Sequence, residues 1–176
     1  MPDPALPPAV VPAARKKKKE AREAALMKLG TSLSTLQRGY RAAADRAVAH
    51  VGLSQTLAYP IVMIGRMEEG VRQGVLAEAL GIEGPSLVRS LDQLVEAGFV
   101  ERREDPADRR AKTLHLTPAG EAVFEPIEAA LNLMRASLFE GVSDDDVAAC
   151  LRVFGLLEER LGRAAPLPWP TAEGRR

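Results

Sequence analysis

The chain has 176 residues, 46% of them hydrophobic but only 4% aromatic, which fits one domain with tails and a core built mainly from Leu, Val, Ile and Ala. Its 24 basic residues balance 24 acidic ones, so no overall basic excess indicates a nucleic-acid partner, and any such partner must be inferred from where the charges lie. A single cysteine, Cys150, excludes an internal disulfide or a cysteine zinc cluster, and the two histidines are too few for a convincing metal site.

Both ends of the chain are expected to be tails. Residues 1–20 begin with a proline-rich stretch that lacks a helical repeat, which predicts disorder, and end with five consecutive positive charges from Arg15 to Lys19. That run is either a solvated tail or frayed helical turn, or an arm that contacts phosphates. Residues 163–176 form a second proline-rich tail. The N-terminal lysines follow the apolar residues, unlike a secretory signal, and no apolar run approaches the ~20 residues of a membrane span, so we expect a cytoplasmic protein.

Apolar residues at helical spacing predict a long first helix over residues 21–51, which Gly52 ends. A second helix is predicted over residues 54–67, with Ser54 as its N-cap. Pro60 lies inside this second helix and should bend it or delay its start, because proline cannot donate a backbone hydrogen bond.

The rest of the chain alternates short elements with capping residues. Gly81 permits a tight turn, Gly98 is placed to stop a helix, and Thr117 and Ser143 are expected N-caps. The predicted elements are helices over 73–80 and 85–97, a strand over 99–104, a turn over 105–108, a strand over 111–116, and helices over 117–140 and 144–162. The order of short helix, glycine turn, helix and β-hairpin is typical of a winged helix-turn-helix, in a chain that is otherwise mostly α.

The helix at 85–97 has two chemically distinct faces. Its apolar stripe consists of Leu87, Leu91, Leu94 and Val95. Its hydrogen-bonding residues, which we predict to lie on another face, are Ser86, Arg89, Ser90 and Gln93. The second helix of such a unit fits the major groove of DNA, where Arg can hold guanine, Gln can hold adenine, and Ser suits a base or a phosphate. The alternative interpretation is an ordinary solvated face.

The predicted hairpin gathers basic side chains. These are Arg102, Arg103, Arg109, Arg110 and Lys112. Acidic residues are interspersed, so the segment is not basic in sum, but the positive charges cluster near the turn. We predict DNA contacts from Arg109, Arg110 and Lys112. Asp108 either holds Arg110 in place while Arg109 stays available, or the two arginines exchange roles.

The stretch LAEALGIEGPSLVRSLDQLVEAGFVERREDPADRRAKTLHLTPAGEAVF resembles the MarR family of transcriptional regulators, and most of all its SlyA branch. The similarity is strong over about residues 76–122 and is co-linear, in helix order and length, over about 26–162. It implies recognition-helix positions at Ser86, Arg89 and Ser90. It also implies that Arg110, with Arg109 beside it, enters the minor groove.

The resemblance further implies one domain over residues 21–162, with a DNA-binding lobe at about 53–116 and dimerisation helices at 21–51 and 117–162. The sequence independently favours a dimer. The long predicted helices have apolar stripes that the small winged unit cannot cover alone.

Members of this family commonly bind small aromatic acids in a crevice between the dimerisation helices and the DNA-binding lobe. The residues here that can stack on or bond an aromatic ring are Tyr40, His50, Tyr59 and Met63. Arg38 or Arg41 can meet a carboxylate. Each also has a structural explanation: Tyr40 lies on the apolar stripe, and His50 can cap helix carbonyls.

Redox sensing and enzymatic activity are two further functions to consider. Cys150 could sense peroxide, as in some family members, but those carry the thiol near the start of the chain, so an inert thiol packed at an interface is the favoured interpretation. An enzyme is not expected, because no nucleophile with a base, no metal-ligand spacing and no Gly-rich phosphate loop is found, and no cofactor is expected.

These observations together predict a homodimeric regulator, of the repressor kind, that binds a pseudo-palindromic DNA operator and is released by a small aromatic carboxylate. The alternatives are a SlyA-like activator that displaces a silencing protein, or a winged-helix module that binds proteins.

Overall fold

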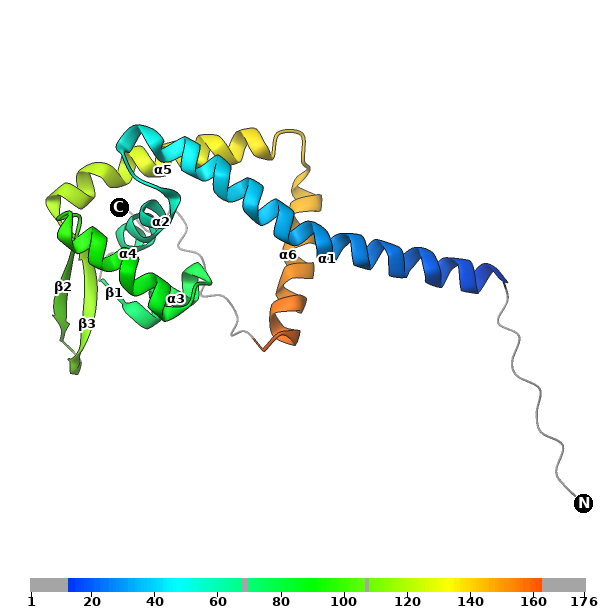
Figure 1. Ribbon diagram of the computed structural model, residues 1–176, viewed down its shortest axis with the longest axis horizontal. Helices are drawn as coiled ribbons and strands as arrows, with labels where there is room; N and C mark the ends of the chain where they lie inside the picture. The colour runs from blue at the N-terminus through cyan, green and yellow to red at the C-terminus, as the bar shows by residue number, and fades with distance from the viewer. Residues whose placement is uncertain (1–12, 68–69, 107, 163–176) are drawn as a thin grey trace, which may run out of the picture. The chain divides into compact units, whose positions relative to one another are not determined.

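A computed structural model describes residues 13–67, 70–106 and 108–162, without the side chains of residues 13–14 and 109–110. The predicted tail over 163–176 and the first twelve residues lie outside these ranges. The chain divides into two compact units, one ending at Ala42 and one beginning at Ala43. The elements are α1 (Ala13–Val48), the short 3-10 helix η1 (Ala49–Val51), α2 (Gln55–Arg66), β1 (Val71–Arg72), α3 (Gln73–Leu80), α4 (Gly84–Glu96), β2 (Val100–Asp105), β3 (Asp108–Leu116), α5 (Pro118–Leu138) and α6 (Asp144–Arg160) (Figure 1).

The predicted order of helices and hairpin is confirmed, but helix α1 starts earlier than expected. It begins at Ala13, so the expectation that residues 13–20 belong to a disordered tail is wrong. Alanine, arginine, lysine and glutamate, which make up this stretch, are all strong helix formers. Their propensity outweighs the repulsion among the lysines.

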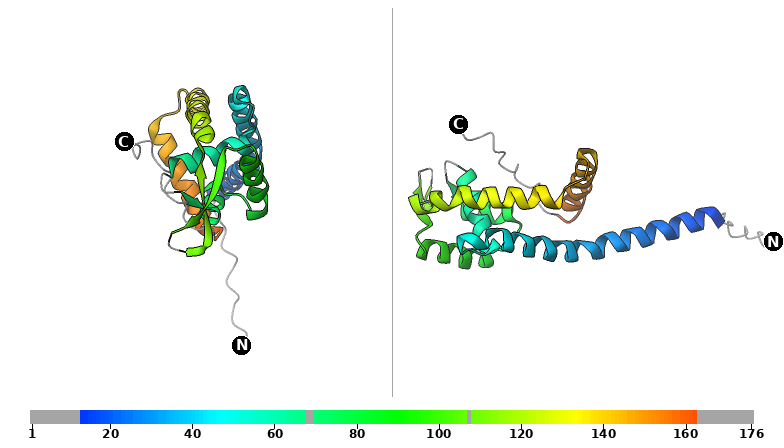
Figure 2. Two further views of the ribbon diagram at one scale, coloured as in Figure 1. Left: turned by 90° about the vertical axis from the view of Figure 1, so that its left-hand side faces the viewer. Right: turned by 90° about the horizontal axis from the view of Figure 1, so that it is seen from above.

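The sheet has one strand more than the sequence indicated. Its order is β1-β3-β2, with both pairings antiparallel. Strand β1 pairs Val71 with Leu114, and the hairpin strands pair from Val100 and Leu116 out to Asp105 and Asp108 (Figures 1 and 2). Strand β1 has only two residues, too few to show an alternating pattern. Strand β3 begins at Asp108 rather than at 111, because the turn is tighter than predicted.

Capping side chains fix the helix starts. Thr117 Oγ1 accepts a hydrogen bond from the Gly120 amide at 3.1 Å, and Ser143 Oγ accepts one from the Asp146 amide at 3.2 Å, so both predicted caps are confirmed. Ser54 occupies the N-cap position of α2 but makes no capping bond with its side chain. Asp45 of helix α1 replaces it, because its Oδ1 accepts a hydrogen bond from the backbone amide of Gln55 at 2.6 Å.

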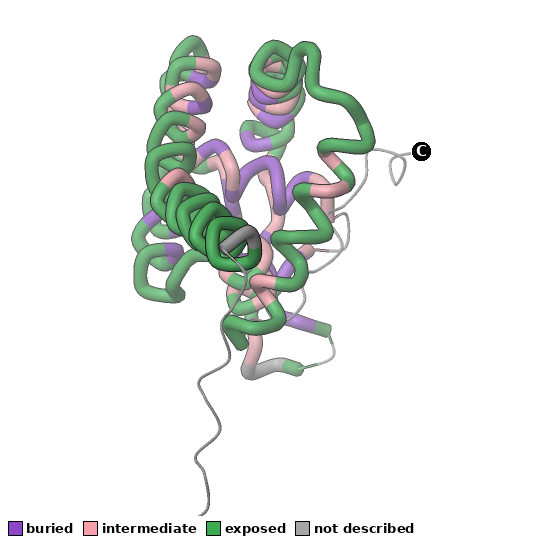
Figure 3. The backbone as a smooth tube through the Cα atoms, turned by 90° about the vertical axis from the view of Figure 1, so that its right-hand side faces the viewer, coloured by how far each residue is buried: buried purple, intermediate pink, exposed green. Residues whose placement is uncertain are grey.

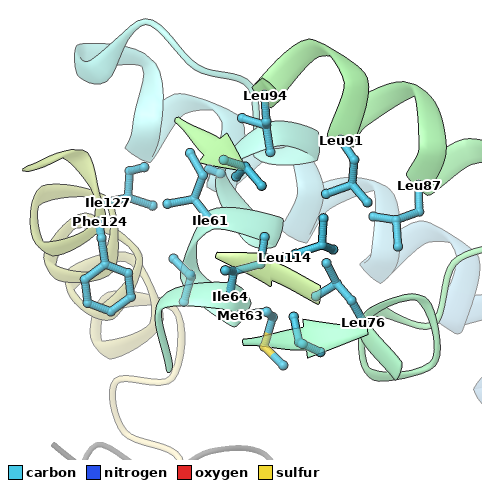
Figure 4. Close-up of a cluster of buried hydrophobic side chains, with 14 of the residues drawn as sticks. Ile61, Met63, Ile64, Leu76, Leu87, Leu91, Leu94, Leu114, Phe124 and Ile127 are labelled. Carbon is cyan, nitrogen blue, oxygen red and sulfur yellow. The ribbon is translucent and has the colours of Figure 1, made fainter. Parts of the chain in front are cut away.

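Helix α2 lies at the centre of the hydrophobic core. The core joins it to helices α3, α4 and α5, to the sheet and to the end of α1, and Figure 4 shows side chains such as Ile61, Leu91, Leu114 and Phe124 meeting there. Pro60 is buried inside α2 without delaying the start of that helix. Burial of these side chains is the main stabilising contribution to this unit.

Helices α2 and α5 approach each other closely. A Cβ added at Gly65 would lie 2.4 Å from the Phe124 ring, so no larger residue fits there without a shift. An ion pair also joins the two helices, with Arg66 Nε 2.6 Å from Glu128 Oε1 and side chains only 11% and 21% exposed. These contacts fix α5 against the core.

Helix α6 contrasts with the core, since none of its residues is buried (Figure 3). It nevertheless carries large apolar side chains at Leu151, Phe154 and Leu161, which are 64%, 43% and 75% exposed. No single described helix is long and apolar enough to cross a membrane. Residues Arg15–Val51 and Gln55–Arg66 are together long and apolar enough, but the chain bends by 78° between them.

Candidate nucleic-acid interface

The core orients helix α4. Leu87, Leu91 and Leu94 are fully buried, so one side of the helix is fixed against helix α2 and the sheet. Pro85 lies in the first turn, where its fixed φ suits a helix start and its missing N–H is not needed. Gly81, with φ of +63°, ends helix α3 in the left-handed conformation that glycine adopts without strain. Helix α3, the turn at Gly81 and helix α4 therefore form the predicted helix-turn-helix.

The side of α4 away from the leucines is exposed. Ser86, Arg89 and Gln93 all lie on it, as predicted. Among the described residues, the Arg89 guanidinium has no hydrogen bond or ion pair. It is thus a long cationic side chain held on a rigid helix with its donors unused.

Ser90 does not lie on the exposed face of α4, contrary to the prediction. It is only 5% exposed, and its Oγ donates a hydrogen bond to the Ser86 carbonyl oxygen at 3.4 Å. Leu87, Ser90, Leu91 and Leu94 are spaced i, i+3, i+4 and i+7, so Ser90 falls within the buried stripe rather than beside Arg89. It is not available for a base or a phosphate.

An ion pair links the hairpin to helix α4. Arg102 Nη2 of strand β2 donates to Asp92 Oδ1 at 2.7 Å. Because Asp92 lies on α4 one position before Gln93, this pair links the base of the hairpin to the helix beside its exposed face. Arg102 was expected in the basic hairpin, but no sequence pattern predicts its pairing with Asp92 on another element.

Two other described basic side chains of the hairpin, Arg103 and Lys112, are paired with carboxylates of the hairpin itself. Arg103 Nε donates to Glu101 Oε1 at 2.8 Å, and Lys112 Nζ lies 3.2 Å from Glu104 Oε1. The Lys112 and Glu104 side chains are 52% and 68% exposed, so their pairing is weak and screened by salt. The contact of Lys112 with DNA stays a prediction.

A second ion pair anchors the outer end of the hairpin. Arg72 Nε of β1 donates to Asp105 Oδ2 at 2.6 Å, although 33 residues separate the two. The Asp105 residue is 7% exposed and adjoins a shift in the β2–β3 register. Its hydrogen bond, and then its charge, raise the pKa of Arg72. No sequence pattern indicated this contact, because β1 is too short to be recognised.

Asp108, Arg109 and Arg110 occupy the start of strand β3. The side chains of both arginines lie outside the described residues. Asp108 is exposed and has an interaction of its own. Its contact with Arg110 stays a prediction, as do the minor-groove roles of the two arginines.

His115 lies near the base of the hairpin, where the sheet meets the segment before β1. Its Nε2 lies 2.9 Å from Thr113 Oγ1, and its ring occupies the space that a Cβ at Gly70 would need. Burial lowers the pKa of His115, and the nearby Arg103 lowers it further. The neutral ring therefore fits this site better than the charged one.

The predicted ligand residues of the second unit have structural roles. Met63 is 1% exposed within a wholly buried apolar run, so it packs in the core, and its contact with a ligand stays a prediction. His50 Nδ1 lies 2.9 Å from the Ala47 carbonyl oxygen, which is the helix-capping alternative. Tyr59 packs in part against the core.

The other ligand candidates belong to the first unit. Arg38 Nη2 donates to Thr35 Oγ1 at 3.3 Å, and both residues are exposed on helix α1. Tyr40 is half-buried, while Arg41 is exposed and has an interaction of its own. Cys150, on helix α6, is exposed in the single chain.

The chain is similar in sequence and in fold to known transcriptional regulators. A sequence profile of the MarR family matches residues 52–111. The chain is 34% identical to the transcriptional regulator PA3341, with a TM-score of 0.70 over 77% of this chain and 99% of that one. It is 27% identical to CouR from Rhodococcus jostii RHA1, solved with p-coumaroyl-CoA, with a TM-score of 0.68 over 73% of this chain and 90% of that one.

A mutant MarR from E. coli, solved in complex with operator DNA, shares the fold at 20% identity. Its TM-score is 0.66, over 75% of this chain and 94% of that one.

Proposed function

Because the chain belongs to the MarR family of winged-helix transcriptional regulators, we propose that it is a homodimeric repressor that reads a pseudo-palindromic operator with helix α4 and the β2–β3 hairpin. The observation that carries this proposal is the exposed face of α4. Arg89 and Gln93 project from a helix whose opposite face is fixed by buried leucines. Both side chains have the donors that read base edges in the major groove.

The hairpin supports the same function. The Arg102–Asp92 and Arg72–Asp105 pairs hold its base and its outer end. A hairpin held at two points can present Arg109 and Arg110 to the minor groove, where groove width and negative potential attract arginine. The sequence DPADRR at the tip also favours the SlyA branch of the family as the nearest group of relatives.

Exposed apolar side chains support a dimer. On helix α1, Leu26, Leu29 and Leu36 are 51%, 45% and 66% exposed, and α6 has no buried residue. Apolar surface of this extent on long helices is typical of a protein–protein interface. A second copy of the chain is the proposed partner. Two copies would set their recognition helices one DNA turn apart, about 34–36 Å.

A small aromatic carboxylate is the proposed effector. CouR is solved with p-coumaroyl-CoA, which is the CoA thioester of an aromatic acid. In this chain, the rings of Tyr59 and His50, both of the second unit, are the candidates to stack on it. An effector that binds better to the DNA-free arrangement of the two reading heads would release the operator.

Selection from a pool of random DNA duplexes tests the proposed function. We expect the protein to enrich one motif made of two inverted half-sites. Enrichment of no motif, with the protein folded, would contradict operator binding and leave protein binding as the function of the winged helix. A control selection with excess aromatic acid should give a weaker enrichment of the same motif.

A further inference from the structure

A basic segment, defined here as Arg15 to Lys19, forms the start of helix α1 and is not used by the function proposed above. All five of its residues are exposed. Its one ion pair within the described part of the chain joins Lys19 Nζ to Glu23 Oε1 at 3.8 Å, with side chains 77% and 62% exposed. Such an exposed pair neutralises little of the charge. The segment is therefore a compact cluster of almost uncompensated cations.

The cluster holds a large share of the basic residues of the chain. The segment holds five of the 24 basic residues, so the rest of the chain carries 19 basic residues against 24 acidic ones. Within the candidate interface, Arg102, Arg103 and Lys112 are each paired with a carboxylate. Most non-specific DNA affinity comes from cations that replace the counterions of phosphates. A net acidic remainder is poorly suited to supply that affinity.

The helix gives the cluster a geometry that suits a phosphate backbone. Arg15, Lys18, Lys19 and Arg22 are spaced i, i+3, i+4 and i+7, so they share one face about 10 Å long. Duplex DNA presents one negative charge per about 1.7 Å of its axis. The cluster also lies at the positive end of the helix dipole, and the first turn holds no acidic residue. A bound polyanion would relieve both this unfavourable placement and the repulsion among the lysines.

The apolar residues of the same stretch distinguish DNA from a membrane surface. A helix that lies in a membrane interface needs bulky apolar side chains opposite its cations. Alanine supplies all the apolar side chains of helix α1 before Leu26. The stretch therefore has no apolar face to insert among lipids.

We propose that the basic segment of helix α1 contacts the phosphate backbone of duplex DNA and adds affinity that does not depend on sequence. This inference rests on the proposed function, because it assigns the segment to the same DNA ligand. The segment would hold the regulator near DNA while the winged-helix unit reads the bases.

The test compares two double variants that remove the same charge from the same helix. Lys18→Gln/Lys19→Gln alters the segment, and Lys28→Gln/Arg46→Gln is the matched control. Glutamine and lysine have similar helix propensities, so the helix is retained. Affinity is measured by fluorescence anisotropy at several salt concentrations, on the duplex that the protein selects and on a random duplex. Sedimentation of each variant reports the association of the chains.

We expect the segment variant to bind both duplexes more weakly by a similar factor, with a salt slope shallower by about 2, since each lost phosphate contact removes about 0.9. The control should retain the parent slope. A parent slope in the segment variant would overturn the inference while leaving the proposed function intact. Dissociation of the segment variant into single chains, but not of the control, would assign the segment to a protein interface and overturn it as well. If the parent selects no motif but the segment variant still loses affinity for random duplex, the proposed function fails and the phosphate contact stands.

Discussion

Replacing Arg89 with alanine separates DNA reading from folding. Arg89 is exposed on helix α4 and has no hydrogen bond or ion pair among the described residues. Alanine is as good a helix former as arginine, so the free energy of unfolding should change by less than about 0.5 kcal/mol. If the guanidinium holds a guanine with two hydrogen bonds, its loss should cost about 1–3 kcal/mol at each half-site. That range corresponds to roughly 5- to 150-fold weaker binding per half-site.

The assay combines site selection with thermal unfolding. We expect Arg89→Ala to unfold at the parent temperature, to bind the selected duplex more weakly, and to lose preference at one base pair of each half-site. Glu96→Ala, at the exposed C-terminal end of the same helix, is the matched control and should keep the parent motif. Arg89→Lys should fall between the two, because lysine keeps the charge but cannot make the paired hydrogen bonds. An unchanged motif and affinity for Arg89→Ala would refute the assignment of α4 as the reading helix.

Four other substitutions probe the scaffold. Arg72→Gln should weaken DNA binding several-fold without loss of fold, because it releases Asp105 at the outer end of the hairpin. Fluorescence anisotropy measures this affinity, and an unchanged affinity would mean that the hairpin needs no anchor there. Gly120→Ala should lower the free energy of unfolding, measured in urea, by about 1–3 kcal/mol, because the new Cβ would collide with the backbone carbonyl oxygen of Phe99. Gly74→Ala should raise the free energy of unfolding by about 0.4–1 kcal/mol, because nothing lies within 4 Å of the new Cβ. Because the folded-state pKa of His115 is lowered from 6.5, its stabilising contribution is present above that pH and is lost as the pH falls below it. His115→Gln should therefore flatten the decrease of the urea midpoint between pH 7.5 and 5.5, and an equal decrease in both proteins would contradict this.

The fold was largely predictable because local chemistry and periodicity agreed along most of the chain. Thr117 and Ser143 cap their helices as expected, and Leu87, Leu91 and Leu94 are buried as expected. The start of α1 was missed for a physical reason. A run of lysines is typical of a solvated tail, yet each lysine is also a strong helix former, and the adjoining helix propagates through it.

The candidate site was predictable only where one element carried it. The exposed face of α4 followed from helical spacing, except that Ser90 was placed on the wrong face although its spacing matches the buried leucines. The contacts that fix the hairpin join residues from different elements, Arg72 with Asp105 and Arg102 with Asp92. Periodicity carries no information on such pairings, because they depend on how the strands and helices pack.

The most direct test of operator reading by a dimer is the stoichiometry and footprint of the protein on its selected duplex. Native mass spectrometry should find two chains per duplex. A hydroxyl-radical footprint should show two protected patches on one face of the DNA, centred about 10 base pairs apart, the separation expected for paired recognition helices. One chain per duplex with a single protected patch would contradict a dimer that reads two half-sites with its α4 helices.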